Sequence, residues 1–224
     1  MTKPKPPQAP DKRERIARRV AAELAHNSLV NLGIGLPTLV ANFIPPDRTV
    51  FLHSENGFIG LGPEAPKDAP DWDIVNAGGK PVTMVHGGCY FDSAMSFAII
   101  RGGHVDVTVL GALEVDEEGN LANYMIPGKM VPGMGGAMDL VVGAKKVIIA
   151  MEHVNKHGQP KILKRCALPL TARREVDLIV TDMAVIRVAH DGLVLEEIAE
   201  DTTVEEVVRC TGARLQIHQK VGEF

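Results

Sequence analysis

The stretch that decides the fold reads Thr49-Val50-Phe51-Leu52-His53-Ser54-Glu55-Asn56-Gly57. Its first five residues are rich in β-branched and aromatic side chains, a composition that favours a β-strand. Asn56-Gly57 favours a tight turn with a positive φ, which ends that strand. Because ligands of open α/β sheets bind at the carboxyl ends of strands, Glu55 stands where a binding crevice is expected. Glu55 is therefore a candidate functional carboxylate.

Outward from this stretch, short apolar strands alternate with helical segments. Further strands are predicted at 29–32, 82–85, 105–110, 146–151, 176–181, 185–188 and 193–198, and helices at 11–25, 38–44, 94–100, 138–144 and 204–210. This alternation predicts an α/β fold with a mainly parallel sheet between helical layers. At 224 residues, we expect one domain over 11–224, preceded by a flexible leader over 1–10 that contains four prolines.

The composition excludes several classes of function. A net charge of -4 argues against a nucleic-acid partner, and no apolar run is long enough to cross a membrane. The three cysteines are far apart, and no signal-peptide pattern precedes them, so we expect reduced thiols in a cytoplasmic protein. No pair of histidines or cysteines has the spacing of metal ligands, so no metal site is predicted.

Three glycine-rich segments, 31–37, 54–63 and 128–139, are predicted to be loops, each next to a strand or helix end. Glycine lets a ligand approach the backbone and leaves N–H groups free to bind anions or carbonyl oxygens. Tight turns alone would also explain the glycines of any one segment. Taken together with Glu55, the three segments predict a shared site.

Glu55 has three possible roles: a surface carboxylate, a general base or a covalent nucleophile. A carboxylate that attacks an activated acyl group forms a mixed anhydride, which can pass the acyl group on. Such a step needs donors for the developing oxyanion. Asn31, Asn56 and the amides of Gly135-Gly136 are the candidate donors.

A competing interpretation rests on Gly33-Ile34-Gly35-Leu36-Pro37-Thr38, which follows a strand and opens a helix. It matches half of the dinucleotide-binding fingerprint, but Thr38 takes the place of the third small residue. No Gly-Lys-Ser or Gly-Lys-Thr of a Walker loop occurs. A non-catalytic module that binds a dinucleotide or a sugar phosphate is therefore an alternative.

Several short motifs form one pattern when they are taken together. They are Asn31-Leu-Gly-Ile-Gly-Leu-Pro37, Ser54-Glu-Asn-Gly57, Ile100-Arg-Gly-Gly-His-Val-Asp106, Leu121-Ala-Asn123, Ile126-Pro-Gly-Lys-Met-Val131 and Gly133-Met-Gly-Gly-Ala-Met-Asp139. In this combination the chain resembles the B subunit of class I (family I) 3-oxoacid CoA-transferases, from about Arg13 to the end of the last predicted helix. The resemblance implies a three-layer α/β/α open sheet.

The resemblance also implies a ping-pong exchange of CoA between an acyl-CoA and a carboxylic acid. The family's catalytic glutamate falls on Glu55, which would form first an acyl-glutamyl anhydride and then a glutamyl-CoA thioester. The family's oxyanion donor falls on Gly136 and its active-site asparagine on Asn31. The family's usual Asn-Ala-Gly-Lys is lengthened by one glycine here, so that the lysine is displaced to Lys80. Candidate CoA contacts are Gly33, Gly35, Gly79, Lys80 and Gly135.

Members of this length need an A subunit, and the resemblance implies an A2B2 heterotetramer with CoA as a substrate and no permanently bound cofactor. The segment 126–134 resembles the acetoacetate-using members. This leaves the CoA donor open between succinyl-CoA and a short-chain acyl-CoA of the butyrate–acetoacetate type. An acyl-CoA hydrolase acting through the same Glu55 is the alternative enzyme.

Overall fold

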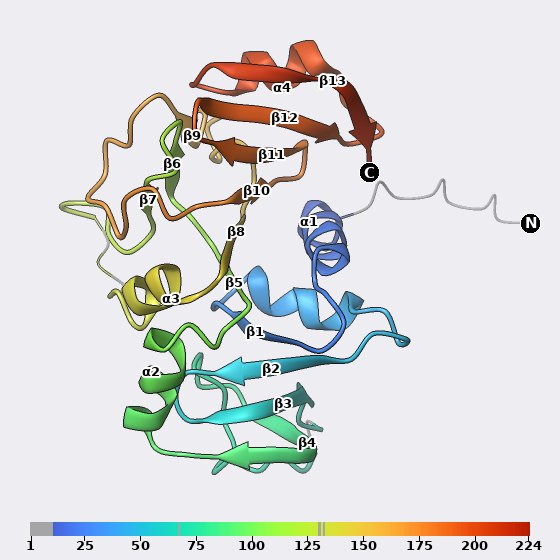
Figure 1. The fold of residues 1–224 in the computed structure, drawn as a ribbon, viewed down its shortest axis with the longest axis vertical. Helices are drawn as coiled ribbons and strands as arrows, with labels where there is room; N and C mark the ends of the chain where they lie inside the picture. The colour runs from blue at the N-terminus through green and yellow to red at the C-terminus, as the bar shows by residue number, and fades with distance from the viewer. Residues whose placement is uncertain (1–10, 67, 130, 132) are drawn as a thin grey trace, which may run out of the picture.

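The computed structural model describes residues 11–224 apart from 67, 130 and 132 (Figure 1). The predicted leader, 1–10, lies outside the described residues. The helices are α1 (Lys12–Ala22), the 3-10 helix η1 (Pro37–Phe43), α2 (Ser93–Arg101), α3 (Ala137–Gly143) and α4 (Val204–Cys210). The strands are β1 (Ser28–Leu32), β2 (Val50–Ser54), β3 (Phe58–Glu64), β4 (Val82–Tyr90), β5 (Val107–Leu110), β6 (Glu114–Asp116), β7 (Leu121–Ala122), β8 (Lys146–Ala150), β9 (Ile162–Leu163), β10 (Leu178–Val180), β11 (Ala184–Ala189), β12 (Gly192–Ile198) and β13 (Leu215–Glu223).

One 10-stranded sheet, in the order β13-β12-β11-β10-β8-β5-β1-β2-β3-β4, runs through the molecule (Figure 1). Its centre, from β10 to β2, is parallel. Antiparallel pairs extend it at both ends, and β13 returns parallel to β12. A three-stranded sheet, β7-β6-β9, lies beside it. The predicted α/β fold with a mainly parallel sheet is confirmed.

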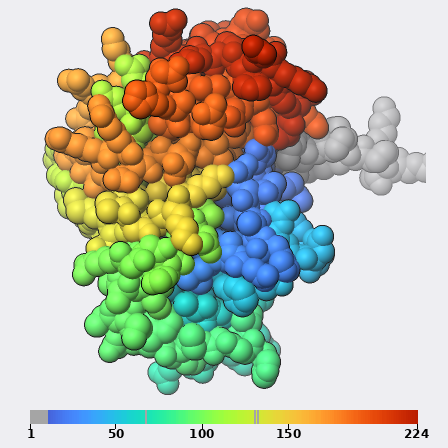
Figure 2. Space-filling model, in the orientation of Figure 1, coloured from blue at the N-terminus to red at the C-terminus, as the bar shows by residue number. Residues whose placement is uncertain are grey.

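Helices cover both faces of the central strands. In Figure 1, α1 and η1 lie on one face, and α2 and α3 lie side by side on the other. The space-filling view shows the yellow surface of α3 directly against the green surface of α2 (Figure 2). Separate apolar clusters fill the two spaces between helices and sheet. The molecule therefore has three layers, as expected.

Helix α1 begins where Asp11 accepts a hydrogen bond from the backbone N–H of Arg13 at 3.0 Å. Ile16, Val20 and Leu24 are spaced by four residues and are fully buried, which fixes the helix on the sheet. Burial of each such side chain contributes roughly 1.5–3 kcal/mol.

Two arginines of α1 form ion pairs with residues that are distant in the sequence. The Arg15 guanidinium pairs with Asp201 at 2.6 Å, and Arg19 pairs with Glu197 at 2.6 Å. Both arginine side chains are mostly buried, with exposed fractions of 16% and 13%. They connect α1 to residues near the end of the chain.

The predicted loop over 54–63 is wrong over most of its length, because Phe58–Glu64 forms β3. Its glycines allow close packing on β4. A Cβ on Gly60 would lie 2.7 Å from the Cα of Gly88, and one on Gly62 would lie 2.5 Å from Thr83 Oγ1. These glycines serve the packing of two strands, where the sequence suggested the approach of a ligand.

His153 ties two distant segments together. Its imidazole is fully buried between Thr181 Oγ1 and Thr211 Oγ1, each 2.9 Å from a ring nitrogen. Thr181 follows β10, and Thr211 caps the end of α4. Burial lowers the pKa of His153 to about 4, so the ring is neutral at pH 7.

We expect acid to destabilise the fold through this residue. The unfolded chain binds a proton near the ordinary histidine pKa of 6.5, whereas the folded chain binds it only at about 4. The contribution of His153 is therefore complete above pH 6.5 and falls by about 2 kcal/mol between pH 7 and pH 5. Urea unfolding at pH 7 and at pH 5 measures this effect. The free energy of unfolding should fall less between the two pH values for His153→Leu than for the unmodified chain. Equal differences would contradict this account.

Candidate active site

Glu55 lies in a tight turn directly after β2. The N–H of Gly57 donates to the carbonyl of Ser54 at 3.0 Å, and Gly57 has a φ of 136°, which favours glycine. The turn thus places Glu55, a half-buried residue, at the carboxyl end of a parallel strand. This is the position expected from the sequence.

Asn31 meets Glu55 from the neighbouring strand. β1 and β2 are parallel, and their register pairs Asn31 with His53. The Asn31 Nδ2 donates to Glu55 Oε2 at 3.0 Å and lies 3.4 Å from the carbonyl oxygen of His53. Asn31 is fully buried, and its Oδ1 has no hydrogen-bond partner among the described residues. The asparagine therefore presents its amide NH2 group to the carboxylate.

The third glycine segment also reaches this point. A Cβ on Gly136 would lie 3.5 Å from Glu55 Cγ and 3.4 Å from the ring of Phe97. The backbone of Gly136, which is buried at the start of α3, thus borders Glu55 directly. One residue from each of the three predicted segments is therefore brought together: Asn31, Glu55 and Gly136.

Comparison with known proteins identifies the family. Residues 13–209 match the coenzyme A transferase family. The chain belongs to this family. The predicted family and enzyme class, a CoA-transferase, are confirmed.

Relatives of this transferase include the beta subunit of the acetate CoA-transferase of Escherichia coli K12, which is 56% identical over 207 residues, 92% of this chain and 94% of the relative. The B subunit of a probable succinyl-CoA:3-ketoacid coenzyme A transferase of Bacillus subtilis is 51% identical over 209 residues, 93% of this chain and 97% of the relative. Both names designate one subunit, and so imply a partner chain in those enzymes.

A solved structure shares the fold of the transferase. The acyl-CoA transferase YdiF of Escherichia coli O157:H7 superposes with a TM-score of 0.76 at 22% identity, over 96% of this chain. This chain spans 43% of that one. At this level of identity the likeness concerns the fold alone.

Two predicted site residues of the transferase have other partners in the structure. The Asn56 Nδ2 donates to the carbonyl of Val75 at 2.8 Å, which directs this amide toward the loop over 71–80. The N–H of Gly33 donates to the carbonyl of Val109 at 2.8 Å, so it is not free for an anion. A Cβ at Gly33 would also lie 2.9 Å from Leu110 Cδ2, which explains the glycine by packing.

The remaining candidate CoA contacts lie on the exposed surface. Gly35, Gly79 and Gly135 have positive φ angles of 90°, 75° and 53°, and a Cβ on any of them would meet no atom within 4 Å. The Lys80 ammonium pairs with Glu64 at 3.3 Å, with both side chains exposed. The backbone at these glycines is open to a large ligand.

The sequence did not single out two residues of α2 that line the site. Ser96 Oγ lies 3.0 Å from His53 Nε2, and the ring of Phe97 faces Gly136. Asp92 caps α2 by accepting from Met95 N at 2.8 Å, which sets the rotation of the helix. Helical periodicity predicted this helix, but no local signal shows which of its residues faces a distant strand.

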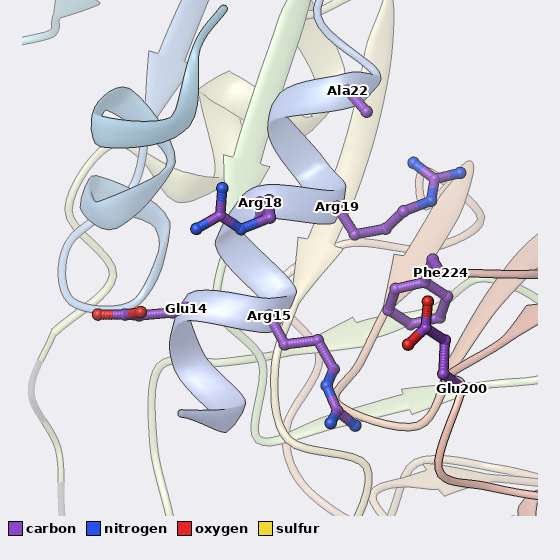
Figure 3. Close-up of a pocket in the computed structure, with 7 residues that line it drawn as sticks. All are labelled: Glu14, Arg15, Arg18, Arg19, Ala22, Glu200 and Phe224. Carbon is purple, nitrogen blue, oxygen red and sulfur yellow. The ribbon is translucent and has the colours of Figure 1, made fainter. Parts of the chain in front are cut away.

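A cavity of about 480 Å³ lies elsewhere, beside α1 (Figure 3). It is lined by Glu14, Arg15, Arg18, Arg19, Ala22, Glu200 and Phe224. As described above, Arg15 and Arg19 are paired with carboxylates, and the Arg18 guanidinium lies 4.5 Å from the ring centre of Phe43. The cavity contains none of the predicted site residues.

In the part of the chain that the structure describes, no cluster of histidine, cysteine, aspartate and glutamate side chains could hold a metal ion. Among the described helices, none has both the length and the apolar character needed to cross a membrane.

Proposed function

We propose that this chain is the Glu55-bearing B subunit of a 3-oxoacid CoA-transferase, which moves CoA between an acyl-CoA and a carboxylic acid. The observation that carries the proposal is the 3.0 Å contact between Asn31 Nδ2 and Glu55 Oε2 at the end of a parallel strand, with the backbone of Gly136 alongside. A carboxylate that is held by an amide and bordered by main chain suits attack on an acyl group.

The reaction runs through two covalent intermediates. A Glu55 carboxylate oxygen attacks the thioester carbonyl, and the C–S bond breaks. CoA leaves as a thiolate, and Glu55 now carries the acyl group as an acyl-glutamyl anhydride. The thiolate then attacks the glutamyl carbonyl, which releases the first acid as its carboxylate and leaves a glutamyl-CoA thioester. The second carboxylate repeats these steps in reverse. No net proton is transferred, so the site needs no general base.

Amide donors stabilise the oxyanion that forms at each attack. We assign this role to the backbone of Gly136 and assign Asn31 to the orientation of Glu55. An oxyanion donor of this kind contributes roughly 3 kcal/mol to transition-state stability. Asn56, Gly33, Gly35, Gly79, Gly135 and Lys80 remain candidates for contacts to the substrate or to CoA, with the open glycines of the surface loops as the stronger ones.

The proposed partner is an A subunit in an A2B2 assembly in the cytoplasm. The relatives named above are beta or B subunits. Exposed apolar side chains on α2 and in the glycine-rich segments support a covering partner, because Ile34, Met95 and Val131 are 68%, 54% and 67% exposed. Acetoacetate is proposed as one acid, since relatives include a probable 3-ketoacid transferase, with succinyl-CoA or a short-chain acyl-CoA as the donor.

Mass spectrometry after incubation with acyl-CoA tests the proposal. When the chain is co-expressed with its A subunit, the peptide that carries Glu55 should gain the mass of CoA less one water, and borohydride should reduce this adduct. The chain alone should form little adduct. A panel of acceptor acids should then discharge it, with acetoacetate among the fastest.

Other outcomes separate the alternatives. Rapid loss of the adduct to water without an acceptor acid would identify a hydrolase. Tight NAD binding with no adduct would identify a dinucleotide-binding module. A fully active assembly of this chain alone would contradict the proposed partner.

A further inference from the structure

A buried polar chain continues behind Asn31, away from the substrate side. His53 Nδ1 lies 3.3 Å from Asn31 Nδ2, and His53 Nε2 lies 3.0 Å from Ser96 Oγ. Asn31 and Ser96 are fully buried, and His53 is 3% exposed. Side-chain contacts therefore link α2 to the catalytic turn, in the order Ser96, His53, Asn31 and Glu55.

The donors and acceptors of this chain can be assigned from their neighbours. Asn31 Nδ2 is a donor, because the opposite orientation would place Oδ1 against the Glu55 carboxylate and the His53 carbonyl, which are both acceptors. His53 Nδ1 must then accept, so the ring proton resides on Nε2 and points to Ser96 Oγ. The His53 ring also stacks on Phe91, with ring centres 6.2 Å apart and planes inclined by 15°, which fixes its rotation.

The surroundings keep the ring neutral. Burial lowers the pKa of His53 to about 4, and Glu55 is separated from the ring by the Asn31 amide. A neutral ring has one acceptor nitrogen, whereas a cationic ring has none. His53 Nδ1 can therefore accept a hydrogen bond from the Asn31 NH2 group throughout the neutral pH range.

We propose that His53, held by Ser96, is a positioning residue that keeps the NH2 group of Asn31 turned toward Glu55. An asparagine amide can rotate by about 180°, and the buried Oδ1 of Asn31 has no hydrogen-bond partner among the described residues that would hold it in its present orientation. The His53 nitrogen opposes this rotation, because a turned amide would set Oδ1 against Nδ1. The inference rests on the proposed function of Glu55.

The first test compares variants of the complete, co-expressed enzyme. His53→Leu removes both ring nitrogens and should slow adduct formation on Glu55 by about 10- to 100-fold, the range found at metal sites when a hydrogen-bond partner that orients a ligand is removed. KM for acyl-CoA should change little. His53→Asn keeps an acceptor near the Nδ1 position and should recover most of the rate.

A double mutant separates positioning from a general effect on folding. If His53 acts through Asn31, His53→Leu should have no further effect on the rate in an Asn31→Ala background. A full additional loss in that background would overturn the proposal. The matched control is His153→Leu. It removes a second buried histidine, which lies between two threonine hydroxyl groups, and should lower stability but leave the rate per folded enzyme unchanged.

A second measurement does not depend on activity. Nitrogen NMR of the ring at pH 7 should show a neutral His53 with its proton on Nε2, and Ser96→Ala should weaken this preference. A proton on Nδ1, or a cationic ring, would overturn the assignment. If the unmodified enzyme forms no adduct at all, the proposed function fails, while the NMR result still decides the state of His53.

Discussion

Glu55→Gln is expected to lower kcat for CoA exchange by at least about 10⁴-fold, the scale on which removal of a covalent nucleophile acts. The glutamine keeps the size of the side chain and its contact with Asn31, but a neutral amide cannot form the anhydride. Glu55 is only half-buried, so the fold should persist. Steady-state exchange and the mass of the adduct both report this effect.

The control for this prediction is Glu205→Gln. Glu205 is an exposed glutamate on α4, at the opposite end of the molecule from β2 and β3 (Figure 1). The Glu205→Gln variant should retain full exchange activity. Substantial exchange by Glu55→Gln, with a thioester on a different residue, would reject Glu55 as the nucleophile.

The second large effect is expected from Gly57→Ala. A Cβ at this position would overlap the carbonyl oxygen of Phe91, and the φ of 136° is unfavourable for alanine. Overpacking and backbone strain together should cost about 3 kcal/mol or more of unfolding free energy. Because Glu55 and Gly57 share one turn, activity per folded enzyme should also fall.

A matched substitution isolates the clash from the strain. Gly158 also has a positive φ, 76°, but a Cβ there would meet no atom within 4 Å. Gly158→Ala should therefore cost about 1 kcal/mol, from backbone strain alone. Thermal or urea unfolding of both variants measures the difference. Equal losses would show that the contact with Phe91 carries no weight.

The central elements could be predicted from the sequence because their signals are local. Apolar runs marked β2, β5 and β8, and a capping residue followed by helical spacing marked α1 and α2. The position of Glu55 followed from a strand and a turn that are adjacent in the chain. Each of these features depends on a few neighbouring residues.

Features that depend on distant contacts could not be predicted. β13 carries many polar, exposed residues at the edge of the sheet, so it has no apolar pattern. β3 owes its glycines to the close approach of β4, which the sequence does not show. Ser96 and Phe97 can be identified as site residues only from the folded structure, in which they contact His53 and border Gly136. Local sequence thus located Glu55, and the fold supplied its surroundings.

The hydrogen bond from the N–H of Phe91 to the carbonyl of Gly57, at 2.9 Å, closes the long excursion of the chain through β3 and β4. It anchors the start of α2 beside the turn that holds Glu55. Exchanges in the loop over 71–80, which lies within this excursion, should therefore leave the spacing of His53 and Ser96 unchanged. The sequence of the excursion can thus vary while the surroundings of Glu55 keep their geometry.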